Sequence, residues 1–120
     1  MTLVTLVIGV HAAVREAAIA ARIEPATSTA VILEGLAPGV SHLVPTTNLQ
    51  IIRIAPGCMC CVGNLTLRVH LNRILRKPPT RLFISLATAT HLTQVREFLT
   101  REPYHAFLTL TENVYATANG

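Results

Sequence analysis

Three cysteines close together are the residues of this sequence best suited to chemistry. Cys58, Cys60 and Cys61 follow Pro56-Gly57 and are the only cysteines among 120 residues. Thiolates are strong ligands for Zn²⁺, Cu⁺ and other soft ions, and a turn after a strand can aim two or three sulfur atoms at one ion. We therefore predict a site for zinc or another thiophilic metal ion at this segment.

A tetrahedral ion bound by three sulfurs needs a fourth ligand, which a side chain or water can supply. Glu34 ends an expected strand and His11 opens an expected helix, so both are candidates. Two alternatives stay open for the cysteines. They could be small apolar core residues, or Cys58 and Cys61 could form a redox pair with C-x-x-C spacing.

The pattern of apolar residues predicts strands that alternate with helices. The expected strands cover 3–9, 29–33, 49–54, 81–86 and 106–110. The expected helices cover 11–23, with Val14, Ala18 and Ala21 on one face, 62–76, and a third segment that Thr90 caps and Pro103 ends.

Such alternation is typical of an α/β fold, here a parallel sheet of about five strands with helices on both faces. Ligands of such sheets gather at the carboxyl ends of the strands, where His11, Glu34 and the cysteines would all lie. We assign residues 1–110 to a single domain and residues 111–120 to a flexible C-terminal tail.

Composition narrows the functional classes. Hydrophobic residues make up 51% of the chain and charged residues 13%, which excludes disorder and favours a homodimer that covers apolar surface. No stretch approaches the roughly 20 apolar residues that span a bilayer. An odd number of clustered cysteines does not make a disulfide framework, so we expect a cytoplasmic protein with free thiols.

The net charge of +4 is carried almost wholly by arginine. Part of it clusters at Arg68, Arg73, Arg76, Lys77 and Arg81. This cluster is either a solvated helix face or a contact for phosphate or an acidic partner. Aromatic residues do not interleave with it, so we expect no nucleic-acid binding.

The segment Gly57-Cys58-Met59-Cys60-Cys61, with Leu65 and an amphipathic helix after it, resembles the Gly-Cys-x-Cys-Cys signature of the CobW-type metallochaperone GTPases. Residues 30–35 resemble that family's second strand and its acidic segment, and residues 82–86 its next strand. The resemblance spans nearly the whole chain and implies a P-loop-NTPase-like three-layer sandwich, cut to the first part of the family's domain. It also implies metal handling and a protein partner that receives the metal.

The phosphate-binding part of that resemblance is degenerate. A phosphate-cradling loop reads G-x-x-x-x-G-K-[ST], and of this only Gly9 is present. Val14, Arg15 and Glu16 stand where the second Gly, the Lys and the hydroxyl residue belong. The chain has no Asp, and Ser85 stands near the family's acidic position. We therefore expect metal binding without a nucleotide and without GTP hydrolysis, hence no enzyme.

Three other functions remain as alternatives. The cysteines could serve thiol redox chemistry, or they could be structural residues of a module that docks a partner. A residual nucleotide hydrolase is the third alternative, and the missing Lys and Asp argue against it.

Overall fold

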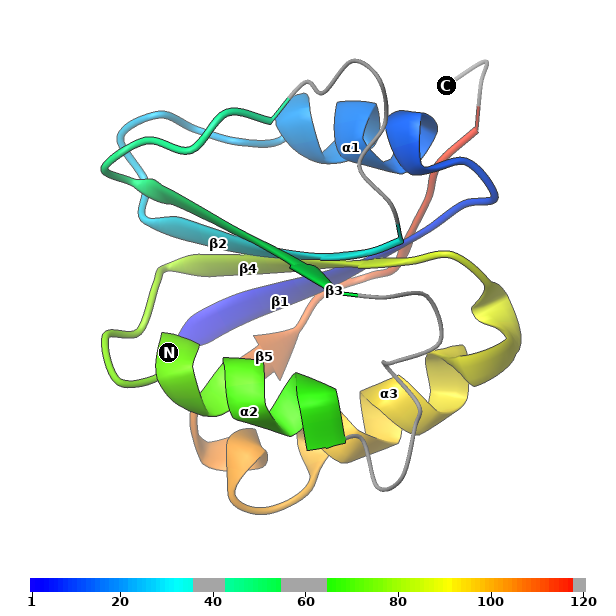
Figure 1. Cartoon of the computed structure of the whole chain (residues 1–120). Helices are drawn as coiled ribbons and strands as arrows, with labels where there is room; N and C mark the ends of the chain where they lie inside the picture. Colours follow the sequence, from blue (N-terminus) through cyan, green and yellow to red (C-terminus); the bar gives the residue numbers. More distant parts are fainter. Residues whose placement is uncertain (36–42, 55–64, 118–120) are drawn as a thin grey trace.

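The computed structural model describes residues 1–35, 43–54 and 65–117 (Figure 1). The strands are β1 (Thr2–Ile8), β2 (Thr29–Glu34), β3 (Leu49–Ile54), β4 (Arg81–Leu86), β5 (Leu108–Leu110) and β6 (Val114–Tyr115). The helices are α1 (Ala12–Ala20), α2 (Leu65–Ile74) and α3 (Leu92–Thr100), with short 3-10 helices at Ala89–His91 and Tyr104–Ala106. The predicted α/β class is confirmed.

Within the described ranges the six strands form one parallel sheet. The strand order is β3-β2-β4-β1-β5, and β6 also pairs with β1. In this register Ser85 of β4 lies opposite both Val7 of β1 and Leu33 of β2. The carboxyl ends of β1, β2 and β4 therefore meet at one edge of the sheet, as the sequence predicts. We call this edge the carboxyl edge.

Helices cover both faces of the sheet, with α1 on one side and α2 and α3 on the other (Figure 1). Along β1, Val7 packs in the cluster that contains Ile19 of α1, whereas Leu6 and Ile8 pack in the cluster under α2 and α3. Successive strand residues point to opposite faces, so a sheet covered twice needs apolar residues at nearly every position. This arrangement is consistent with the expected P-loop-like sandwich.

The buried face of α1 differs from the predicted one. The sequence pattern placed Val14, Ala18 and Ala21 on one face of this helix. Of these Ala18 packs against the core, but the buried residues are Arg15, Glu16 and Ile19. Charged side chains enter a protein interior when their polar atoms find partners there. Both Arg15 and Glu16 have such partners at the carboxyl edge, and these decide which face of the helix is buried.

Two further local predictions are corrected. The N-cap of α3 is His91, not Thr90, and its side chain makes no capping hydrogen bond. Thr88 caps the 3-10 helix just before α3, since its hydroxyl accepts the Thr90 N–H at 3.1 Å. Residues 111–116, expected in a flexible tail, follow β1 instead. The Thr111 N–H donates to Val4 O at 2.8 Å and the Ala116 N–H to Ile8 O at 2.7 Å. A strand of two residues carries no periodic pattern, so the sequence gives no sign of β6.

None of the helices in the described ranges has the length and apolar character needed to cross a lipid bilayer.

Candidate functional site

The predicted metal site can be located only in part. Cys58, Cys60 and Cys61 lie outside the described residues, so their geometry stays a prediction. The strand before them, β3, ends at Ile54, which pairs with Glu34 at the carboxyl edge. Among the described residues, no three His, Cys, Asp or Glu side chains lie together in a group that could hold a metal ion.

Glu34, the acidic candidate ligand, is the last residue of β2. Its side chain is buried, with the residue 6% exposed, and its Oε1 accepts the Ala87 N–H at 2.9 Å. The next residue, Gly35, has a φ of 115° and donates its N–H to Ile54 O at 2.9 Å. Glu34 is therefore held between the ends of β2, β3 and β4, as expected for a residue at the carboxyl edge.

His11, the other candidate ligand, occupies the N-cap position of α1. Its side chain is exposed and makes no capping hydrogen bond, while its carbonyl accepts the Arg15 N–H at 3.1 Å. Since β4 lies between β1 and β2, one strand separates the ends from which His11 and Glu34 emerge. The structure thus places both candidates at the carboxyl edge, but on different strands.

Arg15 is the residue that joins these strand ends. The residue is 2% exposed, and its guanidinium donates three short hydrogen bonds. Nε donates to Ser85 Oγ at 2.6 Å, Nη1 to Gly9 O at 2.6 Å and Nη2 to Glu34 O at 2.8 Å. One side chain therefore links the ends of β1, β2 and β4.

Burial lowers the pKa of the Arg15 guanidinium below its ordinary value, and the nearby carboxylates of Glu34 and Glu16 act in the opposite direction. The guanidinium stays charged under ordinary conditions. A positive charge is thus fixed at the carboxyl edge.

The turn after β1 faces this cation with a carbonyl group. A phosphate-cradling loop does the reverse, because it presents backbone N–H groups to an anion. Gly9 is required here for space: a Cβ at this position would lie 2.9 Å from Ala116 O and 3.1 Å from Arg15 Cγ. The Gly9 that matches the phosphate-binding pattern thus lets Arg15 and the strand beside β1 approach closely.

Glu16 forms a second buried contact of α1. Arg53 Nη1 donates to Glu16 Oε2 at 3.2 Å and Nη2 to Oε1 at 3.1 Å. The Glu16 side chain is 2% exposed and that of Arg53 is 30% exposed. This bidentate pair ties α1 to the outer strand β3. The carboxylate that stands in place of the magnesium-binding hydroxyl therefore has a structural partner.

Sequence reasoning treated Arg15 and Glu16 only as departures from a phosphate-binding pattern and missed what they do. A signal was available, since they are adjacent charges inside a helix otherwise made of Ala, Val and Ile. Buried charges need partners, so this pair predicts polar groups on neighbouring strands.

About half of the chain is similar in sequence to a known protein. Over 58 residues, or 48% of the chain, it is 40% identical to Zinc chaperone YeiR of Escherichia coli (strain K12). The match spans 18% of that protein's own length. No protein-family model matches the chain, and no solved structure matches it either. Part of this chain is therefore similar to part of a zinc chaperone.

Proposed function

We propose that this chain is a CobW-like metal-binding domain that handles Zn²⁺ or another thiophilic ion and does not hydrolyse GTP. The observation that carries the proposal is the similarity to a zinc chaperone in a chain with three cysteines in four residues. Cys58, Cys60 and Cys61 supply the sulfur ligands. The chemistry of this donor set fits soft ions better than Mg²⁺ or Ca²⁺, which prefer oxygen.

The contacts of Arg15 support the absence of nucleotide chemistry. Its three hydrogen bonds fill the space between the strand ends with a guanidinium that faces backbone carbonyls. A triphosphate there would meet the carbonyl oxygens of Gly9 and Glu34, which face the Arg15 guanidinium, instead of backbone N–H donors.

Arg15 also affects which residue can be the fourth ligand of the metal ion. Glu34 has a carboxylate held by the Ala87 N–H, as ligating carboxylates are often held by a second group. Its backbone, however, contacts the Arg15 guanidinium, and that cation disfavours a divalent ion nearby. His11 is exposed and can bind as a neutral imidazole. We propose that His11 or Glu34 completes the site, with the electrostatics favouring His11.

Spectroscopy with Co²⁺ tests the metal site. Titration of the reduced protein should produce a thiolate-to-cobalt charge-transfer band that Zn²⁺ abolishes. Cys58→Ser, Cys60→Ser and Cys61→Ser should each weaken the band, and Met59→Leu is the matched control because it keeps all three thiols. A reduced protein without the band, or cysteine variants that behave like Met59→Leu, would rule the site out.

Two further measurements separate the alternatives. Thiol counts before and after mild oxidation report redox chemistry, since reversible loss of two thiols without metal binding would favour a Cys58–Cys61 pair. Binding of fluorescent GTP would contradict the nucleotide-free part of the proposal. A homodimer and a protein partner that receives the metal remain predictions, which sedimentation and metal-transfer assays can test.

A further inference from the structure

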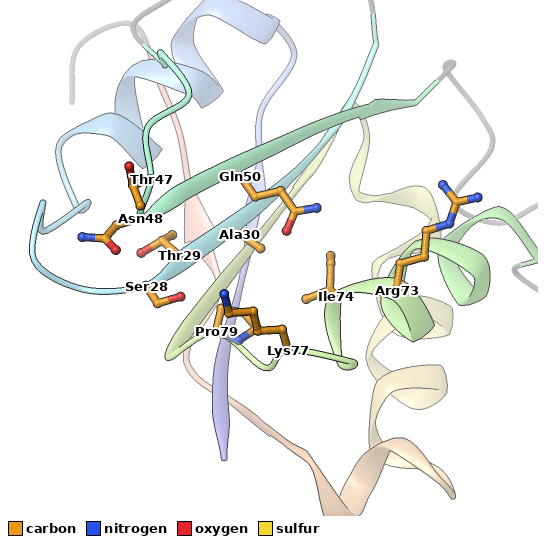
Figure 2. Close-up of a pocket in the computed structure, with 10 residues that line it drawn as sticks. All are labelled: Ser28, Thr29, Ala30, Thr47, Asn48, Gln50, Arg73, Ile74, Lys77 and Pro79. Carbon is orange, nitrogen blue, oxygen red and sulfur yellow. The ribbon is translucent and has the colours of Figure 1, made fainter.

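The basic cluster near the end of α2 has no part in the proposed metal site. Arg73 lies in the last turn of that helix, and Lys77, the only lysine of the chain, follows three residues beyond its end. Both side chains line a pocket of about 150 Å³ at the edge of the sheet where β2 and β3 begin, opposite the carboxyl edge (Figure 2). The pocket therefore lies at the edge of the sheet opposite to Glu34 and His11.

Polar groups and cations make up most of the pocket lining. In Figure 2 the Lys77 amine reaches across the pocket towards Ser28, while Arg73 stands at the rim formed by α2. None of the described residues that line the pocket is acidic. The polar and charged lining residues are Ser28, Thr29, Thr47, Asn48, Gln50, Arg73 and Lys77. The Asn48 Nδ2 already donates to Pro25 O at 3.0 Å.

Backbone hydrogen bonds hold the two walls of this pocket together. Ser28 O accepts the N–H groups of Thr80 and Arg81 at 2.9 and 3.1 Å, which fixes the entry of β2 to the chain just after Lys77. The Thr29 N–H donates to Asn48 O at 2.8 Å, which fixes the entry of β3 to the same wall. These hydrogen bonds hold together the backbone segments that form the pocket.

Arg73 and Lys77 form no ion pair within the described part of the chain. No carboxylate described by the structure lies within ion-pair distance of Arg73 or Lys77, whereas Arg53 and Arg101 each have a glutamate partner. Cations at a helix C-terminus also stabilise the helix dipole. That role alone does not account for the Ser28 hydroxyl and the Gln50 side chain, which face Lys77 across the pocket in Figure 2.

We propose that this pocket binds a phosphate group, either as inorganic phosphate or as the phosphate of a small monoester. An ammonium with three donors, a hydroxyl and amide N–H groups can meet several oxygens of a tetrahedral anion. The volume of about 150 Å³ is below the roughly 300–1,000 Å³ of pockets that enclose whole small molecules. It therefore suits a single phosphate group.

A titration followed by backbone amide NMR tests this site. Inorganic phosphate and glycerol phosphate are added in separate experiments at constant ionic strength, with acetate as the comparison anion. We expect saturable shifts confined to residues 28–30, 47–50 and 73–77. Binding by phosphate indicates the free ion as ligand, and binding by glycerol phosphate alone indicates a monoester.

Charge-matched variants make the test specific. Lys77→Met should weaken binding about tenfold or more, since it removes a cation at contact distance. Arg76→Met is the control, because Arg76 is exposed and does not line the pocket; it should change affinity by less than about twofold. Gln50→Leu, which keeps the charge, should also weaken binding. Unsaturated shifts, acetate binding as strong as phosphate, or equal losses in Lys77→Met and Arg76→Met would overturn the proposal.

Discussion

Replacing Arg15 tests whether its guanidinium holds the carboxyl edge together. Arg15→Met keeps an unbranched side chain but removes all three hydrogen bonds. The Ser85 hydroxyl can turn towards another partner, whereas the carbonyls of Gly9 and Glu34 lose a charged donor. Each buried acceptor left without that donor costs about 1–3 kcal/mol. Relief from burying a charge offsets part of the loss, so we expect a net destabilisation of about 2–4 kcal/mol.

Urea unfolding measures this difference, with an unchanged slope expected if the variant keeps the same fold. The matched control is Arg22→Met, because Arg22 follows the same helix and its Nη1 donates to Ala18 O at 2.7 Å in an exposed position. This control should change the free energy of unfolding by less than about 0.5 kcal/mol. A loss below about 1 kcal/mol in Arg15→Met, or equal losses in the two variants, would refute the role given to the buried guanidinium.

Two other contacts give predictions of the same kind. Arg53→Met should lower the free energy of unfolding in urea by about 1–3 kcal/mol, because it leaves the buried Glu16 carboxylate without this partner. A double variant that adds Glu16→Gln should recover part of that loss. Strictly additive losses would show that the two residues are not coupled. Tyr104→Phe should cost about 1 kcal/mol, since the Tyr104 hydroxyl donates to Asn72 Oδ1 at 2.9 Å. Burial also raises the pKa of Tyr104 above its ordinary 10.0, so the folded state keeps this proton longer than the unfolded state. Stability should therefore fall as the pH rises above 10.0, and an equal fall in Tyr104→Phe would contradict this origin.

The order of strands and helices was predictable because it follows from local patterns. The runs 6–8 of β1 and 30–33 of β2 are apolar and buried at every position, as parallel strands covered on both faces must be. The carboxyl-edge positions of Glu34 and His11 then followed from strand polarity alone. The strands, the helices and the positions of the strand ends were predictable because they depend on which neighbouring residues along the chain are apolar.

The interior of the carboxyl edge was not predictable in this way. A charge on a helix normally faces solvent, and the apolar neighbours of Arg15 in α1 mark the charge as unusual without indicating which residues are its partners. Its partner Ser85 lies 70 positions away, and the Arg53 partner of Glu16 lies 37 positions away. Only the folded sheet brings these groups together, so the buried face of α1 is decided by tertiary contacts and not by helical periodicity.

The position of β1 inside the sheet has a consequence for the kinetics of folding. The first strand of the chain pairs with β4, β5 and β6, and the hydroxyls of Thr5 and Thr111, 106 positions apart, are hydrogen-bonded at 2.6 Å. Closing such long intervals costs chain entropy before any contact is gained. During synthesis, β1 stays unpaired until β4, β5 and β6 have been translated. We therefore expect slow folding and an early need for a chaperone to shield this strand.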